Sequence, residues 1–347
     1  MTKPTEQLPE TEQFLPVIFG FALTQIAGTT ARLGIPDLLD SPKTADELAA
    51  ATGADPRCLQ RLLRAATAVG VLGATDGGLF ELTTVGRIFR SDSPWQAGLH
   101  DAMHSHLAVW RAWGALEEAV RSGQPAFDIV NGMGVFDYLQ RDAKLAGYFH
   151  ATMATGTAAQ LPSILANYDF SRFSRVVDVG GGNGTFLAAV LAANPGLRGT
   201  LFNAEDGLAE TPEILRQAGV ADRCDIVAGN FFESVPAGAD AYLLKSVLHD
   251  WDDESCQRIL RNCRDAMGPD GRVVVLTSLM PEGKATEDPG EALAVAIQDI
   301  EMMVMCPGAI RTLAEHERLF ANAGLRLGEA RSLSCPFLFH AVEGLPA

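Results

Sequence analysis

Apolar residues follow two different spacings along this chain, and the change falls near residue 173. Before it, apolar positions recur three or four residues apart, as at Leu59 and Leu63, and this spacing is typical of amphipathic helices. After it, short apolar runs alternate with helical stretches, which favours an α/β fold with a mainly parallel sheet and helices on both faces. The pattern therefore predicts a mostly helical domain over residues 1–165 and an α/β domain over residues 166–347.

The N-terminal half contains a helix, a second helix and a hairpin in direct succession. The first helix is predicted to begin at Thr44 and to end at Gly53, and Asp55 begins the next, which closes at Gly70. A turn of sequence Asp-Gly-Gly at residues 76–78 then separates two short apolar runs. This order predicts a winged-helix domain.

A winged helix raises the alternative of DNA binding, because Arg57, Arg61 and Arg64 lie on its second helix. Their spacing is also that of an ordinary solvated helix face. The chain has 27 Lys and Arg residues against 43 Asp and Glu residues, a net charge of −16, which opposes contact with nucleic acid or an anionic membrane. It also has no apolar run long enough to cross a bilayer. We therefore expect a dimerising or structural use of this domain, and no nucleic acid or membrane partner.

Five short apolar segments in the second half are predicted strands, with helices between them. They cover residues 175–179, 200–202, 225–228, 240–244 and 272–276, and two later segments near 325–333 and 336–342 favour a terminal hairpin. In open parallel sheets, ligands bind beyond the carboxyl ends of the strands. Residues that directly follow these strands are therefore the first functional candidates.

The most informative of these turns follows the first strand, in the sequence RVVDVGGGNGTFL. Gly180, Gly182 and Gly184 give the spacing G-x-G-x-G, whereas a dinucleotide site needs G-x-G-x-x-G. Glycine lets a ligand approach the backbone closely, and the helix that follows presents its N-terminus. The spacing suits a nucleoside without a pyrophosphate, so S-adenosylmethionine is the predicted cofactor, and Asp178 at the strand end joins the predicted cofactor site.

The next two strands end in residues suited to a nucleoside. Asn203 follows the second strand, where nucleotide-binding sheets place an acid on the ribose, and nearby Glu205 is the alternative. Asn230 and Phe231 follow the third strand and offer an amide and a ring to adenine. We therefore include Asn203, Asn230 and Phe231 in the predicted cofactor site.

The fourth strand is followed by the residues that we expect to carry the chemistry. Lys245 stands at its end, and His249 and Asp250 come shortly after. A histidine with an ordinary pKa of about 6.5 is a suitable general base near neutral pH. His249 is therefore the predicted catalytic base, and Asp250 is the runner-up that orients it or caps the next helix.

Taken together, the segments VVDVGGGNG, GNFFE and LLKSVLHDWDDE resemble those of class I S-adenosylmethionine-dependent small-molecule O-methyltransferases, which include plant caffeate and flavonoid enzymes and bacterial polyketide-tailoring enzymes. TADELAAATG and RLLRAATAVGVL resemble the family's winged-helix dimerisation domain. The resemblance implies a Rossmann-like catalytic domain and a homodimer whose N-terminal domain helps to close the partner's active site.

The same resemblance assigns roles to the candidate residues. It implies that Gly180 and Gly182 pass the methionine end of the cofactor, and that Asn203 faces the ribose. It places Asn230, Phe231 and Lys245 beside adenine and makes His249 the base for the acceptor hydroxyl. The family usually has an acid at Asn203 and commonly Asp at Asn230. Plant members also have two glutamates near the histidine, where this chain has Thr277 and Ile310.

The predicted function is methylation of a hydroxyl group on a small aromatic or polyketide-like natural product. The alternative is a relative that does not transfer methyl, with the cofactor structural, electrostatic or absent, and that promotes a cyclisation, pericyclic rearrangement, decarboxylation or hydroxylation. Large apolar residues are predicted to line the acceptor pocket, with core packing as the alternative for each: Trp110, Phe149, Met153, Met302 and Met303.

The six cysteines are scattered and form no Cys-x-x-Cys pair. This pattern is typical of free thiols in a reducing compartment, and it argues against a zinc site. We therefore expect a cytoplasmic enzyme that needs no metal.

Overall fold

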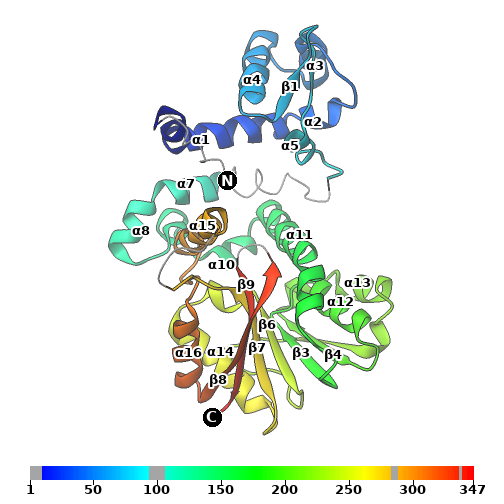
Figure 1. Ribbon diagram of the computed structural model, residues 1–347, viewed down its shortest axis with the longest axis vertical. Helices are drawn as coiled ribbons and strands as arrows, with labels where there is room; N and C mark the ends of the chain where they lie inside the picture. The colour runs from blue at the N-terminus through cyan, green and yellow to red at the C-terminus, as the bar shows by residue number, and fades with distance from the viewer. Residues whose placement is uncertain (1–9, 94–105, 283–287, 336–337) are drawn as a thin grey trace, which may run out of the picture. The chain divides into compact units, whose positions relative to one another are not determined.

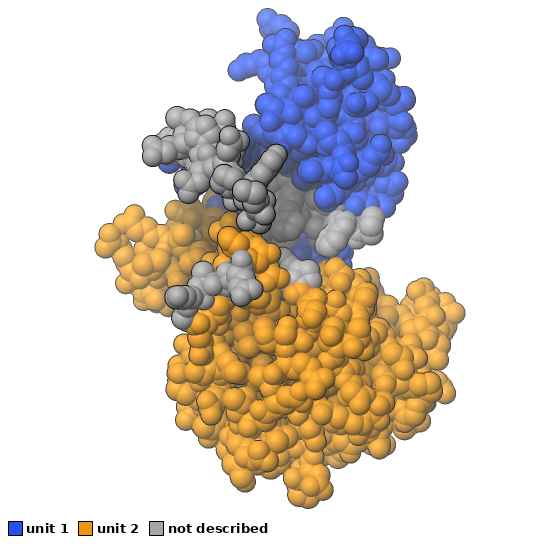
Figure 2. Space-filling view, in the orientation of Figure 1, with its two compact units in different colours: residues 1–110, 142–155 blue, residues 111–141, 156–347 orange. Residues whose placement is uncertain are grey.

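The computed structural model describes residues 10–93, 106–282, 288–335 and 338–347. Figure 1 shows its helices and strands, and Figure 2 shows the two compact units into which the chain divides. Unit 1 comprises residues 1–110 and 142–155, and unit 2 comprises residues 111–141 and 156–347. The division falls inside helices α7 (Leu107–Gly114) and α11 (Ala143–Asn167), and the functional domains predicted for residues 1–165 and 166–347 stay a prediction.

The described residues of unit 1 form helices and one short hairpin. The Thr44 hydroxyl accepts a hydrogen bond from the Glu47 amide, and the Glu47 carboxylate accepts one from the Thr44 amide, so a capping box begins α3 where the sequence predicted. Leu72 pairs with Leu82 in the antiparallel hairpin. The elements wholly in this unit are α1 (Glu10–Arg32), α2 (Ile35–Leu38), α3 (Ala45–Thr52), α4 (Pro56–Ala68), β1 (Leu72–Ala74), β2 (Phe80–Leu82) and α5 (Thr84–Arg87).

Helix α4 has two distinct faces. Leu59 and Leu63 are buried in the core of unit 1, whereas Arg57, Arg61 and Arg64 are exposed and line a shallow surface pocket. The arginines thus lie on the solvated face that the helical spacing predicted. The absence of a nucleic acid partner stays a prediction.

Unit 2 is a seven-stranded sheet with helices on both faces. The strand order is β5-β4-β3-β6-β7-β9-β8; the pairs from β5 to β7 are parallel, and β9 runs antiparallel to both β7 and β8. The predicted α/β fold is confirmed, and the five parallel strands lie within two residues of their predicted ends. The terminal hairpin is longer than predicted, and residues 336–337 lie outside the described part.

The strands of unit 2 are β3 (Arg175–Val179), β4 (Arg198–Asn203), β5 (Cys224–Ala228), β6 (Ala241–Lys245), β7 (Arg272–Ser278), β8 (Leu325–Cys335) and β9 (Phe339–Pro346). Its helices are α8 (Leu116–Ser122), α9 (Ala126–Asn131), α10 (Val135–Leu139), α12 (Thr185–Ala193), η1 (Glu205–Leu208), α13 (Thr211–Gln217), η2 (Ala221–Arg223), η3 (Leu248–Asp250), α14 (Asp253–Ala266), α15 (Pro289–Met305) and α16 (Leu313–Asn322).

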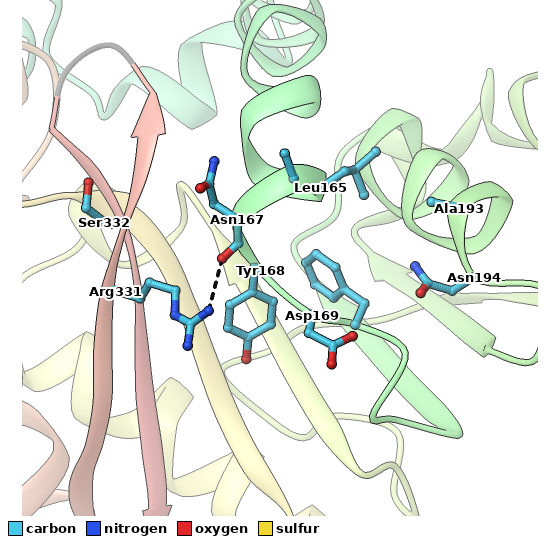
Figure 3. Close-up of a pocket in the computed structure, with 10 residues that line it drawn as sticks. Leu165, Asn167, Tyr168, Asp169, Ala193, Asn194, Arg331 and Ser332 are labelled. Atoms are coloured by element: carbon cyan, nitrogen blue, oxygen red, sulfur yellow. Dashed lines mark hydrogen bonds between the residues drawn. The ribbon is translucent and has the colours of Figure 1, made fainter.

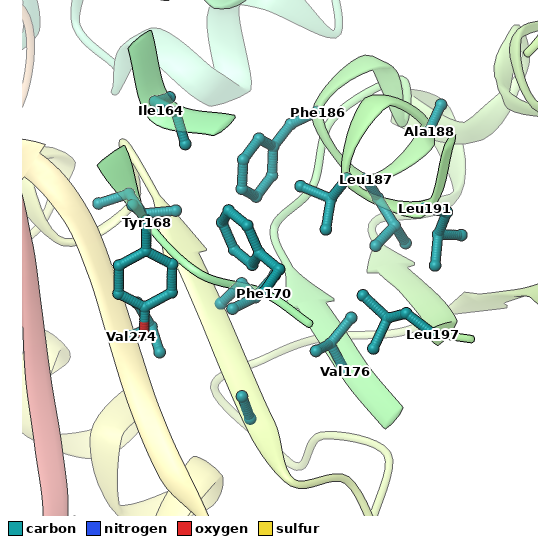
Figure 4. Packing of buried hydrophobic residues seen from close by; sticks show 14 of the residues in the cluster. Ile164, Tyr168, Phe170, Val176, Phe186, Leu187, Ala188, Leu191, Leu197 and Val274 are labelled. Carbon is teal, nitrogen blue, oxygen red and sulfur yellow. The ribbon is translucent and has the colours of Figure 1, made fainter. Parts of the chain in front are cut away.

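Alternate residues of the central strands enter two separate cores. On one face, Val176 packs with Phe170 and Phe186 beneath α12 and the end of α11, as Figure 4 shows. On the other face, Val177 and Tyr242 belong to the cluster that also contains buried residues of α14 and α16. A strand that is buried on both faces has apolar residues at successive positions, and this made the strands recognisable in the sequence.

A buried carboxylate joins three segments of unit 2. Glu343 on β9 is 3% exposed, and its Oε1 accepts hydrogen bonds from the Tyr168 hydroxyl (2.8 Å) and from Arg172. Its Oε2 accepts one from Arg272 Nη1 at 2.9 Å. Burial alone raises the pKa of Glu343, but these donors outweigh it and leave the pKa below its ordinary value.

Replacing Glu343 by glutamine is expected to lower the free energy of unfolding by about 2 kcal/mol, because both arginines lose their counter-charge. Since the native pKa is depressed from 4.5, the wild-type advantage is complete above that value and is lost as the pH falls below it. Urea unfolding at several pH values measures this. Glu329→Gln is the control, because its pair with Arg331 is half exposed, and it should change stability by less than about 0.5 kcal/mol. Equal losses in both variants would contradict the expectation.

All six cysteines lie among the described residues, and all are free thiols. Cys58 on α4 is exposed, and the other five are buried. Within the described ranges, no helix combines the length and apolar character needed to cross a membrane.

Candidate functional site

The glycine turn joins the carboxyl end of β3 to the first turn of α12. A Cβ on Gly181 would lie 2.4 Å from Leu201 Cδ1 and 2.5 Å from Asp178 Oδ2, so a side chain here would require these buried neighbours or the turn to move. Gly182 has a φ of 58°, and no atom lies within 4 Å of where its Cβ would be. Helix α12 begins at Thr185, and its first amide groups have no partner within the helix. The turn therefore offers backbone donors and open space to a ligand.

Asp178 lies beneath this turn and is 1% exposed. Its carboxylate oxygens have no hydrogen-bond partner among the described residues. Burial raises the pKa of Asp178 to about 7, and the positive charge of Lys245 acts against that rise. The carboxyl group is thus buried next to Gly181, and its predicted contact with the cofactor stays a prediction.

The two asparagines make different local contacts. Asn203 Nδ2 donates to the Gly182 carbonyl at 3.2 Å, so its side chain braces the glycine turn. Asn230 Oδ1 accepts from the Phe232 amide at 3.0 Å, and its Nδ2 donates to Glu233 Oε1 at 3.3 Å. Asn203 therefore contacts the glycine turn, a contact that the sequence did not predict, whereas Asn230 is exposed and holds the loop after β5. Their predicted contacts with ribose and adenine stay predictions.

Phe231 lies beside the glycine turn, where its Cε1 is 3.5 Å from the position of a Cβ on Gly180. It also belongs to an aromatic cluster around Trp251. The Trp251 ring lies 6.0 Å from Phe231, 4.8 Å from Phe232 and 5.2 Å from Phe136, between centroids. The cluster thus extends from the turn to the loop that carries His249, and its role as a unit was not predicted from the sequence.

Lys245 ends β6 and points toward α11 and β9. Its Nζ donates to Thr157 Oγ1 at 3.1 Å and lies 5.6 Å from the centroid of the Phe339 ring. Burial lowers the pKa of Lys245 to about 8, and the negative charge of Asp178 partly offsets this effect. Lys245 therefore stands at the end of the fourth parallel strand along the chain, as predicted, with its ammonium group held by Thr157. Its predicted place beside adenine stays a prediction.

His249 and Asp250 belong to the short helix η3, which follows β6. His249 Nε2 lies 3.4 Å from Asp250 Oδ1, and Nδ1 is buried with no partner among the described residues. Burial, together with the positive charges of Lys245 and Arg311, lowers the pKa of His249 to about 4. Burial also raises the pKa of Asp250 to about 7. At neutral pH the imidazole is therefore uncharged and able to accept a proton.

Val247 connects this loop to the glycine turn. Its Cγ2 is 3.0 Å from the position of a Cβ on Gly180, and His249 follows two residues later. The structure thus places the ends of β3 and β6 next to each other, as their parallel pairing requires. A ligand bound at the glycine turn and a base on η3 would therefore lie at the same edge of the sheet.

The predicted pocket residues are divided between the two units. Met302 and Met303 are half-buried on α15 in unit 2. Trp110, Phe149 and Met153 belong to unit 1, where Met153 is 45% exposed. A common acceptor pocket lined by all five stays a prediction.

Comparison with known families agrees with this geometry. Residues 113–326 match the model of the O-methyltransferase domain, and residues 15–92 match that of the O-methyltransferase dimerisation domain. This chain belongs to the O-methyltransferase family. The resemblance noted in the sequence is thereby confirmed, and the enzyme belongs to a family of S-adenosylmethionine-dependent methyltransferases.

Relatives of this O-methyltransferase come from natural-product pathways. It is 39% identical over 307 residues to the mitomycin biosynthesis 6-O-methyltransferase of Streptomyces lavendulae, covering 87% of this chain and 85% of that protein. It is 34% identical over 357 residues to the aclacinomycin 10-hydroxylase RdmB of Streptomyces purpurascens, covering 99% and 93%. The structure of NcsB1 from neocarzinostatin biosynthesis, with S-adenosylmethionine and 2-hydroxy-5-methyl naphthoic acid, is 32% identical, with a TM-score of 0.82 and coverage of 94% and 96%.

The residues at the sheet edge of this O-methyltransferase fit S-adenosylmethionine in their chemistry. The turn at Gly182 is open, the Asn203 amide lies against it, and the Phe231 ring offers an apolar face next to Gly180. Among the described residues, no group of three or more His, Cys, Asp or Glu side chains is arranged to hold a metal ion.

Two residues near His249 were missed by the sequence reasoning. Gly308 and Arg311 follow α15 and lie against η3, some sixty residues earlier in the chain. The segment PGAIRT drew attention only because Ile310 replaces a glutamate of plant relatives, and Ile310 is buried. An arginine just before a helix resembles a surface residue in a sequence, so no local signal identified it.

A separate pocket of about 490 Å³ lies at the opposite end of α12 (Figure 3). Ala193 and Asn194 line it where α12 ends, whereas the glycine turn precedes the start of that helix. Its charged groups are engaged locally: Arg331 binds Glu329, and Asp169 accepts from Ser171. We assign no function to this pocket.

Proposed function

We propose that this enzyme uses S-adenosylmethionine to methylate a hydroxyl group of a small aromatic or polyketide-like natural product. The observation that carries the proposal is His249, an imidazole kept uncharged by burial at the same sheet edge as the open glycine turn. The similarity to the mitomycin methyltransferase and to NcsB1 supports the reaction and the acceptor class.

The cofactor, when bound, supplies an electrophilic methyl group. We assign Gly180 and Gly182 to its methionine end and Asn203 to its ribose, with Asn230, Phe231 and Lys245 on the adenine side. We also assign Asp178, which is buried next to Gly181, to the cofactor site. These residues bind and orient the donor, so that much of the rate arises from alignment of two reactants.

His249 is the proposed general base. Its Nδ1 has no partner in the described part of the chain, so we assign this atom to the acceptor hydroxyl, while Nε2 faces Asp250. The proton moves from the hydroxyl to the imidazole as the oxygen becomes nucleophilic. The Asp250 carboxyl fixes the ring and stabilises the imidazolium that forms. The pair therefore combines proton removal with orientation.

The proposed acceptor site is apolar. Met302 and Met303 on α15, together with Trp110, Phe149 and Met153, are the residues that we assign to it. The aromatic cluster at Trp251 offers a further flat surface on the side of η3. Such a lining favours a planar aromatic acceptor.

We also propose that the enzyme is a homodimer that works in the cytoplasm. The matched dimerisation domain supports the dimer, and so do apolar side chains on α1, where Val17 is 79% exposed and Phe21 63%. Residues 1–165 would then form the dimerisation and lid domain, and residues 166–347 the catalytic domain. The six free cysteines support a reducing compartment.

The deciding experiment gives the purified chain S-adenosylmethionine with a deuterated methyl group and a set of hydroxynaphthoic acids, beginning with 2-hydroxy-5-methyl naphthoic acid. Mass spectrometry should find the deuterated methyl on the acceptor. A chain that binds the cofactor in calorimetry but labels no acceptor in the set would contradict the proposal.

A second candidate is a reaction without methyl transfer, namely a cyclisation, pericyclic rearrangement, decarboxylation or hydroxylation. The similarity to the hydroxylase RdmB favours it, as does the lack of a carboxylate at Thr277 and Ile310. The same experiment separates the two, because the acceptor would then be converted without gaining deuterium. Mass spectrometry detects a decarboxylation or hydroxylation, and chromatographic retention detects a rearrangement that leaves the mass unchanged.

Replacing Asn203 by alanine is expected to weaken binding of S-adenosylhomocysteine about fivefold, because the glycine turn loses its brace and the ribose loses a partner. Isothermal calorimetry measures this. Asn194→Ala is the matched control, since Asn194 donates to Val190 at the far end of α12. Unchanged affinity in Asn203→Ala would place the ribose contact elsewhere.

A further inference from the structure

The loop that carries His249 has few hydrogen bonds of its own. Within it, the Asp250 amide donates to Val247 at 3.2 Å and the Trp251 amide to Leu248 at 3.4 Å, both long for backbone bonds. A short 3₁₀ turn has poor hydrogen-bond geometry and is weakly stable alone. The position of His249 therefore depends on what packs against this turn.

The segment between α15 and α16 packs against it closely. A Cβ on Gly308 would lie 1.7 Å from the His249 carbonyl oxygen and 2.6 Å from the Asp250 carbonyl carbon, so the two backbones are in direct contact. The Ile310 amide donates to Asp299 Oδ1 on α15 at 2.8 Å, which fixes the segment at its other side.

Arg311 completes this contact from a buried position, with 5% of its surface exposed. Its Nη1 donates to the Leu248 carbonyl at 2.8 Å, and its Nη2 donates to the Trp251 carbonyl at 2.7 Å. These carbonyls stand directly before His249 and directly after Asp250. The guanidinium therefore spans the two residues, and Nε holds Asp253 Oδ1 at 2.9 Å on the other side.

We propose that Arg311 is a positioning residue, which holds the η3 turn so that His249 presents its imidazole to the acceptor. This inference rests on the proposed function of His249 as a base. A planar group with fixed donors suits the task, because two of its nitrogens reach two carbonyls at once. Lysine has one nitrogen and cannot reproduce this geometry.

The charged surroundings of His249 give the proposal a measurable signature. Lys245 on β6, Arg311 before α16 and His316 on α16 lower its pKa, and Asp250 on η3 faces its Nε2. From α14, Cys256 contacts the Leu248 and Trp251 carbonyls, and Asp253 pairs with Arg311. Removing the charge of Arg311 leaves the other groups in place. The imidazole should then become easier to protonate, and it should also lose its fixed position.

The first experiment follows the His249 imidazole by NMR in the full chain labelled with ¹⁵N-histidine, and it needs no acceptor. The signal is assigned by its loss in His249→Asn. In Arg311→Gln we expect the midpoint of the His249 titration to rise by about one pH unit. Arg318→Gln is the matched control, because Arg318 is exposed on α16 and pairs with Glu315. An unchanged midpoint in Arg311→Gln would overturn the proposal.

The second experiment measures kcat with the acceptor that the labelling assay identifies. Arg311→Gln is expected to lower kcat about 10²-fold and Arg311→Lys about tenfold, with the KM for S-adenosylmethionine nearly unchanged. In the His249→Ala background, Arg311→Gln should cost less than about twofold more, because the residue acts through His249. A loss as large in that background as in the wild type would show a purely structural role and reject the proposal.

Asp253→Asn covers the case in which removal of a buried arginine prevents folding. The Asp253 side chain is 70% exposed, so this variant should fold. Because the Arg311 guanidinium loses its carboxylate partner, we expect kcat to fall about threefold. If this variant keeps the wild-type kcat and melting temperature, the result would count against the positioning role of Arg311. If no acceptor is methylated, the proposed function fails, while the NMR titration still decides the role of Arg311.

Discussion

Replacing His249 by alanine should lower kcat by at least about 10²-fold, the usual size of a lost general base. The imidazole is uncharged at neutral pH, since burial and the positive charges of Lys245 and Arg311 hold its pKa near 4. The KM for S-adenosylmethionine should stay within about threefold, because the histidine acts on the acceptor and not on the donor. Steady-state kinetics with a methylated acceptor measure both constants.

The pH dependence of the wild-type enzyme supplies a second measure of the same role. The base works in its neutral form, and its pKa is depressed. The value of kcat/KM should therefore hold as the pH falls through 6.5 and decline only toward about 4. Turnover that survives in His249→Ala, or a decline centred at the ordinary histidine pKa, would remove His249 from this role.

Replacing Gly181 by alanine should weaken binding of S-adenosylhomocysteine at least about tenfold and lower the free energy of unfolding by about 1–3 kcal/mol. The added methyl would lie 2.4 Å from Leu201 Cδ1 and 2.5 Å from Asp178 Oδ2, so either the buried neighbours or the turn must move. Calorimetry with the product and urea unfolding measure the two effects.

Gly196→Ala is the matched control for this substitution. No atom lies within 4 Å of a Cβ at Gly196, and its φ is not positive, so alanine fits there. Its affinity should equal that of the wild type and its stability should change by less than about 0.5 kcal/mol. Gly181→Ala with wild-type affinity would mean that the turn is not the cofactor site.

Much of the fold could be predicted because the parallel strands are buried on both faces. Val176 and Val177 enter opposite cores, and this double burial produces the apolar runs that mark each strand. Once the strands are placed, parallel pairing brings their carboxyl ends to one edge. The positions of Gly180, Asn203 and His249 at that edge follow from this geometry alone.

The side-chain contacts of the site could not be predicted in the same way. Arg311 reaches carbonyls about sixty residues away, and backbone acceptors carry no sequence signal. The burial that lowers the pKa of His249 also depends on residues from several elements. Asn203 was expected at the ribose, yet its contact with Gly182 depends on a backbone angle that the residue pattern does not specify.

The cysteines described above offer a practical route to the assembly of this enzyme. Of the six, Cys58 alone is exposed, and burial raises the pKa of Cys256 to about 12, so that thiol carries almost no reactive thiolate. A maleimide dye should therefore attach to unit 1 without any engineering of the chain. Energy transfer between dyes on mixed copies would then report subunit association and exchange in the unaltered protein.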